Sequence, residues 1–309
     1  MRRLNSILLS LFTAVGGFAA AAAPSNGSFE ELAGYVPSGS GMIMFVDAGK
    51  LHDSGWLKQL DKLPLAKDMV PDAGVESGNV VMFASNPADR DAAIALLYNP
   101  EIDSLDKLMA AEAASFAEVG SSPVKTMVCN MDAFSVSVPK LNVTTYYAML
   151  EPHWFIMGMS EKAIAEYLAT PSAELGLNAE QMKQLAPYKG EAIFGTVVLP
   201  ASASAGMDGI DIVGVLRDDT LTVRTISRYR VAAAAEQMES QMVAMKPMLG
   251  TLLEQQMPGC GKLLADAITV SRAGNNVTIA FTFTPELFAK MAEAGKSMEA
   301  SGASVLPRE

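Results

Sequence analysis

Methionine is the residue whose abundance and spacing most directly suggest a chemistry. The chain contains 20 methionines, and Met242, Met245 and Met248 recur at every third position in the segment MESQMVAMKPM. Thioethers are soft ligands that bind Cu(I) well, and closely spaced methionines can supply several such ligands. The spacing therefore predicts a candidate soft-metal site, for Cu(I) or Ag(I), formed by these three side chains.

The same methionines also fit a structural interpretation, in which one side of a helix packs against a core. Apolar residues recur here at steps of four, three, four and three, at Met238, Met242, Met245, Leu249 and Leu252. Such steps place side chains on one helical stripe, and methionine is an adaptable core residue. Pro247 predicts a kink or a restart of this helix, because proline lacks a backbone donor. A methionine-lined groove for a partner is the third interpretation.

Two cysteines, Cys129 and Cys260, are candidates for a disulfide. An exported chain can form one, and this bridge would close a long loop between the two halves of the chain. The alternative is two separate buried thiols, because Cys129 lies in an apolar, strand-like run where a free cysteine is common. The sequence leaves both states open, since it does not give the distance between the two residues.

Residues suited to catalysis are sparse apart from carboxylates. His52 and His153 are the only histidines, and both are expected in turns, so neither is predicted to be a general base. The sequence lacks a Gly-x-Ser-x-Gly elbow, a phosphate-binding loop, a dinucleotide-binding motif and a His-Glu-x-x-His helix. We therefore predict no catalytic residues and no cofactor. A carboxylate-dependent hydrolase is an alternative, because the chain has 34 acidic residues.

The N-terminus has the pattern of a secretory signal peptide. Arg2 and Arg3 precede the apolar run Ile7–Val15, and an alanine-rich stretch ends the segment. A short basic region, an apolar core and small residues before the cleavage site define such a peptide, here residues 1–22. The apolar run is shorter than the roughly 20 residues that a bilayer-spanning helix needs. We therefore expect a bacterial periplasmic or secreted protein with no stable membrane span after cleavage.

The composition indicates a folded, acidic protein. The formal net charge is −11, and loss of Arg2 and Arg3 with the signal peptide takes it to −13, since −11 − 2 = −13. A chain of this charge repels phosphate backbones, so nucleic-acid binding is not expected. Apolar residues make up 50% of the chain and charged residues 18%. This composition supplies enough apolar surface for a sizeable core.

The segment Ser271–Met291 shows how the chain is built. Apolar side chains alternate with smaller or polar ones, as in a strand with one buried face, at Val277, Ile279, Phe281 and Phe283. The residues 274–276 suit the turn of a hairpin, and Thr284 is a suitable N-cap for a following helix. The same order of hairpin and helix recurs in 146–168, from 212 onward and, more loosely, in 80–116.

These recurring units predict an α+β fold with a mainly antiparallel sheet and helices packed on one face. Each hairpin exposes one apolar face, and each helix has an apolar stripe that can cover it. A polar segment at 170–181 divides the chain. We therefore predict an N-terminal half, 23–170, and a C-terminal half of similar plan, 171–309, which could share one sheet. The extreme C-terminus, about 297–309, is expected to be flexible.

The sequence therefore favours a non-enzymatic protein of the bacterial envelope that binds an unknown protein or small molecule. Its contact surface is expected either between the two halves or beside the helix around Met242–Met248. Soft-metal binding through Met242, Met245 and Met248 is one alternative function. Carboxylate-dependent hydrolysis is the other.

Overall fold

The structure is a computed structural model, and it describes residues 28–56, 78–118, 120–138, 143–199, 206–256 and 259–300. The predicted signal peptide, 1–22, lies outside the described residues, as does 301–309 in the C-terminal segment that we expected to be flexible. The chain forms two compact units. Of the described residues, unit 1 contains 28–53 and 78–198, and unit 2 contains 54–56 and those from 199 onward.

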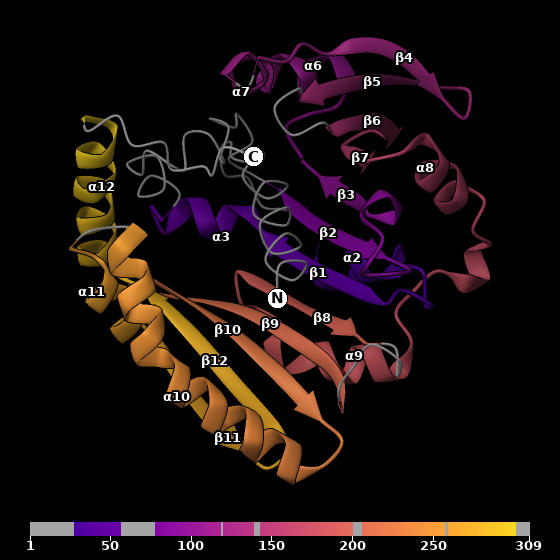
Figure 1. Ribbon diagram of the computed structural model, residues 1–309. Helices are drawn as coiled ribbons and strands as arrows, with labels where there is room; N and C mark the ends of the chain where they lie inside the picture. Colours follow the sequence, from indigo (N-terminus) through magenta and orange to yellow (C-terminus); the bar gives the residue numbers. More distant parts are fainter. Residues whose placement is uncertain are drawn as a thin grey trace. The chain divides into compact units, whose positions relative to one another are not determined.

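Unit 1 is built on a large antiparallel sheet, which confirms the predicted α+β class. Its strands are β1 (Met42–Asp47), β2 (Asn79–Ala84), β3 (Ile94–Tyr98), β4 (Val124–Val128), β5 (Met131–Val138), β6 (Val143–Glu151), β7 (Trp154–Gly158) and β8 (Ile193–Val198). They follow the order β8–β1–β2–β3–β7–β6–β5–β4, and every neighbouring pair is antiparallel (Figure 1).

Short helices connect and cover these strands. They are α2 (Phe29–Gly34), α3 (Ala48–Asp53), α6 (Leu105–Ala111), α7 (Ala113–Glu118), α8 (Glu161–Leu168) and α9 (Ala179–Leu185). At α8 the Ser160 hydroxyl accepts a hydrogen bond from the Ala163 backbone N–H at 3.1 Å, as in a serine N-cap. At α9 Asn178 and Gln181 form a reciprocal capping box. The capping side chains therefore determine where α8 and α9 begin.

One face of the unit 1 sheet carries a core that α2, α8 and α9 cover. The strand registers place four apolar residues level with one another, at Phe45, Val81, Leu96 and Ile156. The three helices contribute one fully or almost fully buried residue each, Leu32, Ile164 and Leu185. Burial of an aliphatic side chain of this size contributes about 1.5–3 kcal/mol, so this layer is a main source of stability in unit 1.

The opposite face of the same sheet is also apolar. Met44, Met82 and Met157 lie level with one another across β1, β2 and β7, and each is at most 6% exposed. Tyr147 pairs with Met157 and contacts Phe116 of α7, with ring centroids 6.1 Å apart. Helix α7 therefore lies on the face opposite α8, so the prediction of helices on one face is wrong for unit 1. The central strands are apolar on both faces, and each face therefore needs cover.

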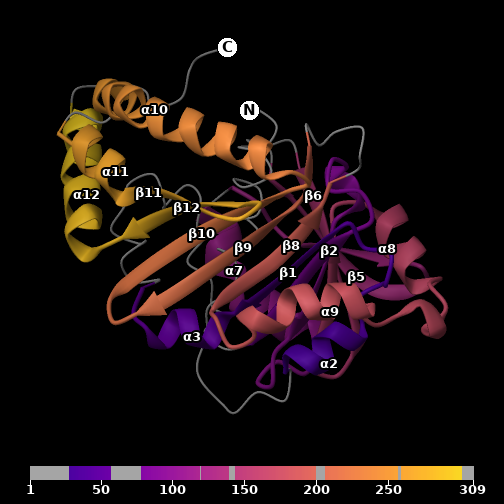
Figure 2. The same ribbon diagram turned by 90° about the horizontal axis from the view of Figure 1, so that it is seen from below.

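Unit 2 combines antiparallel strands with a long helix. Its elements are β9 (Met207–Arg217), β10 (Thr220–Tyr229), α10 (Ala232–Gln256), α11 (Gly261–Ala267), β11 (Ile268–Ala273), β12 (Asn276–Phe283) and α12 (Pro285–Ala300), and its strand order is β11–β12–β10–β9. Gly274 has a φ of 60° in the β11–β12 turn, and the Thr284 hydroxyl accepts a hydrogen bond from the Leu287 backbone N–H. Figure 2 shows α10 running along β10, β11 and β12.

The core of unit 2 joins residues that are far apart in the sequence. Trp56 is 4% exposed and contacts Phe283 and Phe288 edge-on, with ring centroids 5.9 and 5.6 Å apart. Aromatic pairs with this geometry contribute about 0.5–1.5 kcal/mol beyond their buried area. Residues 54–56 therefore belong to unit 2, although they directly follow α3 of unit 1 in the sequence.

The units divide after Val198, whereas the sequence suggested a division at 170/171. Strand β8 pairs with β1, and Leu185 of α9 is fully buried in the unit 1 core. Strand pairing and apolar burial thus keep 179–198 in unit 1. The polar segment that suggested the division is a surface connection between α8 and α9 within one unit.

Glu112, which follows α6, is a buried carboxyl group in unit 1. The residue is 3% exposed, and its Oε1 atom has no hydrogen-bond partner among the described residues. Burial disfavours the charged form and raises the pKa of Glu112 from 4.5 to about 8. Burial also raises the pKa of Tyr147, and the charge of Glu112 adds to this effect. Ionisation of Glu112 is therefore expected to destabilise unit 1.

We expect Glu112→Gln to remove part of the pH dependence of stability. The unfolded chain ionises Glu112 above pH 4.5, whereas the folded chain keeps it protonated up to about pH 8. The free energy of unfolding therefore falls as the pH rises between these values, by up to about 1.4 kcal/mol per pH unit. Urea unfolding at a series of pH values measures this slope. The variant should lose the part of the pH dependence that comes from Glu112. Equal slopes in the variant and the wild-type protein would contradict a buried, protonated Glu112.

Candidate binding groove

Helix α10 is the element around which the sequence placed its candidate sites. It runs without interruption from Ala232 to Gln256 and contains Pro247, so the helix does not restart there. One turn later, the Thr251 hydroxyl donates a hydrogen bond to the Pro247 carbonyl oxygen at 3.3 Å. Helix α10 thus accommodates a single proline, and it packs along β10, β11 and β12 of unit 2.

The three methionines of the predicted metal site do not share one environment. Met242 and Met245 are half-buried on α10, whereas Met248 is 56% exposed. Each three-residue step turns about 60° short of a full helical turn, so the third side chain moves off the buried stripe. Among the described residues, no group of His, Cys, Asp or Glu could hold a metal ion either. Soft-metal binding by methionine stays a prediction.

Helices α10 and α11 approach closely because the residues at their contact are small. A Cβ atom added to Gly261 would lie 2.5 Å from Glu254 Cβ and would also collide with the carbonyl oxygen of Gly250. A Cβ atom on Gly250 would lie 3.2 Å from the Cβ of Ala265. Backbone therefore packs against backbone here, and only glycine fits at Gly261 without displacing α10.

Glu254 joins the end of α10 to the start of α11. Its Oε1 atom accepts a hydrogen bond from the Gly259 backbone N–H, and its Oε2 atom accepts one from the Gly261 backbone N–H, both at 2.7 Å. Hydrogen bonds to a charged acceptor are stronger than neutral ones. The carboxylate thus satisfies backbone donors at the start of α11 and fixes the geometry of the two helices.

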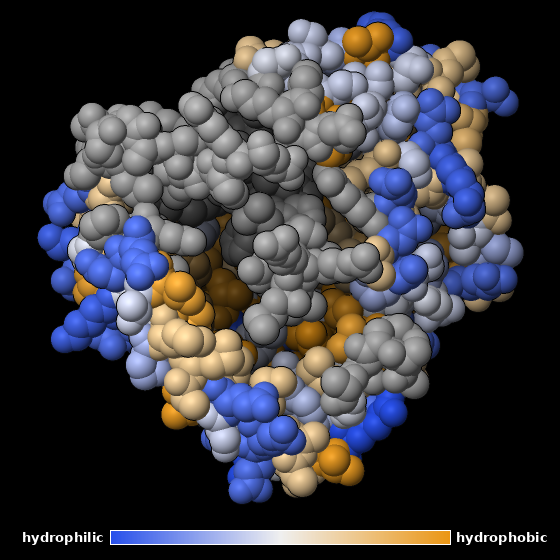
Figure 3. Space-filling view, in the orientation of Figure 1, coloured by the Kyte–Doolittle hydropathy of each residue, from blue (hydrophilic) through white to orange (hydrophobic). Residues whose placement is uncertain are grey.

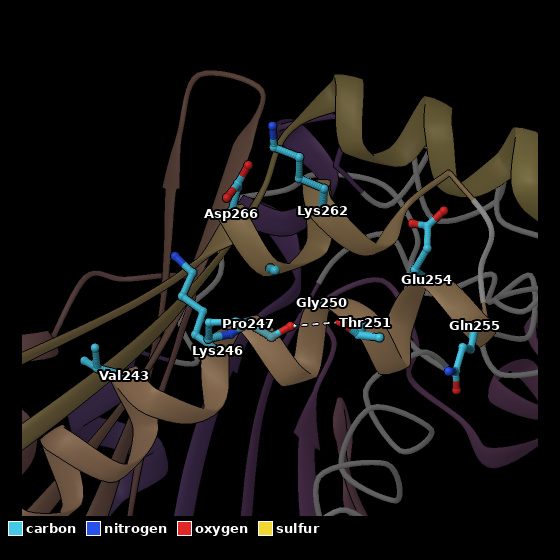
Figure 4. A pocket seen from close by; sticks show the side chains of 10 residues that line it. Val243, Lys246, Pro247, Gly250, Thr251, Glu254, Gln255, Lys262 and Asp266 are labelled. Carbon is cyan, nitrogen blue, oxygen red and sulfur yellow. Dashed lines mark hydrogen bonds between the residues drawn. The ribbon is translucent and has the colours of Figure 1, made fainter.

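A groove of 690 Å³ lies along this contact between α10 and α11. It is lined by Val243, Lys246, Pro247, Gly250, Thr251, Glu254, Gln255, Lys262, Ala265 and Asp266 (Figure 4). Val243, at one end of the groove, is 54% exposed. Met248 and Leu252, elsewhere on α10, are each exposed over about half of their surface. On the face seen in Figure 3, hydrophobic residues lie among hydrophilic ones along α10. The groove therefore combines exposed apolar surface with charged side chains at its margin.

The charged side chains of the groove differ in whether they already have partners within the protein. Both oxygens of Glu254 accept backbone hydrogen bonds within unit 2. Lys246 and Lys262, in contrast, take part in no ion pair recorded within the described segments, and Figure 4 shows both ammonium groups pointing out from the helices. Asp266 contributes one further carboxylate to the margin. The two lysines leave cationic groups available to a ligand beside an apolar floor.

The two histidines have local structural contacts. His153 occupies the β6–β7 turn with a φ of 72°, and its Nδ1 atom lies 3.2 Å from the carbonyl oxygens of Asn99 and Ile102. His52 lies in α3, with Nδ1 3.6 Å from an Asp53 carboxylate oxygen. His153 thus connects the β6–β7 turn to the segment that follows β3.

The two cysteines lie in different settings. Cys129 is exposed in the turn between β4 and β5, with a φ of 51°, rather than in a strand. Cys260 is 1% exposed, and its thiol lies 3.4 Å from the Lys290 carbonyl oxygen. Burial raises the pKa of the Cys260 thiol. Both residues are free thiols in the structure, and a disulfide between them stays a prediction.

The sequence suggested a contact surface beside α10 but gave no indication of the part of the groove that α11 contributes. Lys262, Ala265 and Asp266 follow the Gly259–Gly261 segment, whose glycines flank Cys260. These glycines were the available signal, because a close approach of two helices requires small residues. Their partner, Gly250, could not be identified without the tertiary structure.

Comparisons with known proteins assign the chain to no family. No protein-family model and no curated protein matches it. Solved structures with some likeness include crystal forms III and I of TP0453. Form III is 10% identical, covers 84% of this chain and 97% of that chain, and has a TM-score of 0.42. Form I is 9% identical, with 84% and 96% covered and a TM-score of 0.39. Likeness of this degree carries no argument about function.

No helix in the described ranges of the chain is both long and apolar enough to cross a bilayer. The long helix α10 carries charged residues along its length, including Lys246 and Glu254.

We expect Gly261→Ala to destabilise unit 2 and to change the groove. The added methyl group collides with α10, and overpacking of this kind costs about 1–3 kcal/mol. Gly34→Ala in α2 is the matched control, because a Cβ atom there meets nothing within 4 Å. Urea unfolding of the three proteins tests this. Equal stability of Gly261→Ala and Gly34→Ala would contradict the described helix contact.

We expect a maleimide to react with one cysteine of the native protein, Cys129. Cys260 is buried and its pKa is raised, so its reactive thiolate is scarce and inaccessible until the protein unfolds. Intact-mass spectrometry should show one adduct in buffer and two in urea, and Cys129→Ser should show none in buffer. The alternative disulfide would give no adduct in either condition before reduction.

Proposed function

We propose that the protein is an exported, non-enzymatic protein of the bacterial envelope that binds a partner protein in the groove between α10 and α11. The observation that carries this proposal is the groove itself, with its apolar floor, its exposed Val243 and its two lysines. Binding sites are concave, largely apolar and equipped with a few polar groups that fix orientation. The groove is shallow, with apolar surface from Val243, Pro247 and Ala265 and charged side chains at its margin.

The N-terminal sequence supports the proposed location. Arg2, Arg3 and the following apolar run have the order of a secretory signal peptide. Removal of residues 1–22 would deliver an acidic protein to the periplasm or the exterior. The mass of the protein purified from the bacterial envelope tests this, because cleavage after Ala22 gives a defined new N-terminus.

The charges of the groove indicate the chemistry of the partner. Lys246 and Lys262 flank the groove, whereas the carboxylate of Glu254 is used by the backbone of α11. A partner segment with apolar side chains and at least one carboxylate would fill the groove and pair with the lysines. Such pairs steer association and fix orientation more than they add affinity, so the apolar contacts would supply most of the binding energy.

Charge reversal in the groove tests the proposed function. We expect Lys246→Glu combined with Lys262→Glu to weaken partner binding at least about tenfold, equivalent to about 1.4 kcal/mol. Lys162→Glu combined with Lys183→Glu, at exposed positions of α8 and α9, is the matched control, because both double variants replace two positive charges with two negative ones. The readout is the yield of a photo-crosslink from a photoreactive residue at position 243 to a protein in periplasmic extract.

The position of the crosslinker provides a second control. A photoreactive residue in place of Leu168, which is 37% exposed on α8, should capture little of the same protein. Equal capture from positions 243 and 168, or equal capture by the charge-reversed and wild-type proteins, would contradict binding in the groove.

A further inference from the structure

Strand β4 lies at one end of the unit 1 sheet and has a free edge. It pairs with β5, and no other strand in the described ranges pairs with it. Figure 1 shows β4 as the outermost strand beyond β5 and β6. Such an edge presents unpaired backbone N–H and C=O groups that can bind another strand.

The β4–β5 turn determines which backbone groups face outward. Cys129 and Asn130 have φ values of 51° and 64°, and they join the facing residues Val128 and Met131 in a two-residue hairpin. In such a hairpin the residues next to the turn exchange backbone hydrogen bonds, and this role alternates along the strand. Val124, Thr126 and Val128 therefore bond to β5, and the backbone groups of Lys125 and Met127 point to the free edge.

The side chains of β4 leave this edge unprotected. Val124 is 60% exposed and Met127 is 57% exposed. Proteins commonly guard an edge strand with a lysine whose charge projects outward. Here the Lys125 ammonium group lies 3.1 Å from Asp106 Oδ1 and 5.5 Å from the centre of the Phe134 ring. The lysine is thus directed over the face of the sheet, toward α6 and β5.

We propose that β4 binds β4 of a second copy of this chain in antiparallel orientation, with the twofold axis at Thr126. In this register Lys125 and Met127 of one copy face Met127 and Lys125 of the other. All four outward-facing backbone groups of each strand then form hydrogen bonds across the axis. No like charges face each other directly, and Val124 lies opposite Val128 of the second copy.

The two neighbouring symmetric registers, with the axis at Lys125 or at Met127, are less favourable. An axis at Lys125 would place two ammonium groups directly opposite each other, which is destabilising. An axis at Met127 would pair Lys125 with Cys129, which is not extended because its φ is 51°. The axis at Thr126 also places the two threonine side chains opposite each other, where they can form a hydrogen bond.

The first test measures the oligomeric state with the free edge blocked. We expect the protein to form dimers, detected by light scattering over a concentration series, and Met127→Pro to weaken them at least about tenfold. Proline at this position removes an outward-facing N–H and keeps the hydrogen bonds to β5. Met127→Thr is the matched control, because it also removes the thioether but retains the N–H. A monomer up to about 1 mM, or dimers that Met127→Pro does not weaken, would overturn the proposal.

The second test reports the register and does not depend on the folding of the proline variant. Residues at a non-hydrogen-bonded antiparallel pair have Cα atoms about 4.5 Å apart, within the range that a disulfide spans. We therefore expect Thr126→Cys, in a Cys129→Ser background, to form a disulfide-linked dimer on mild oxidation. Asp132→Cys in the same background should not. Absence of the Thr126→Cys dimer, or equal linkage at both positions, would overturn the proposed register.

Discussion

The close contact between α10 and α11 is the constraint on which the candidate groove depends. Gly261 and Gly250 let the two backbones meet, and Glu254 then ties the end of one helix to the start of the next. A side chain at Gly261 would force the two helices apart and widen the groove, because its Cβ atom would collide with the backbone of α10. The same carboxylate that fixes the geometry is thereby withdrawn from Lys246 and Lys262, so one set of local contacts determines both the shape and the charge of the groove.

The architecture of unit 1 depends on a different constraint, the burial of its sheet on both faces. Central strands such as β1 and β2 are buried along almost their entire length, and both faces are apolar. With both faces covered, the outer edge of β4 is where backbone groups remain unpaired with any strand in the described ranges. At β4 the turn residues and the direction of Lys125 leave that edge open, which is why the structure suggests an association through backbone pairing.

Local patterns allowed much of the secondary structure to be predicted. The alternation at 277–283 and the threonine at 284 correspond to β12 and the cap of α12. The β4–β5 hairpin was missed, because its turn contains a cysteine at positive φ within an apolar run that reads as a continuous strand. Cover on both faces of unit 1 was missed for a related reason, since hairpins were assumed to bury one face only.

Long-range contacts were beyond prediction from the sequence. The packing of Trp56 against Phe283 and Phe288 joins segments that no local pattern connects. The α11 side of the groove is similar, because Gly250 and Gly261 acquire meaning only when the helices are placed together. The sequence indicated the neighbourhood of Met242–Met248 as a candidate contact surface because of its closely spaced methionines and Pro247, and that placement stays a prediction.

Hydrogen–deuterium exchange with and without periplasmic extract tests the central claim, binding in the groove, most directly. A bound partner would exclude water from the helical segments that line the groove, so the account predicts slower exchange in peptides that cover 243–255 and 262–266. The Lys246→Glu and Lys262→Glu double variant should show no such protection. Unchanged exchange in these peptides, or the same protection in the variant, would contradict the account.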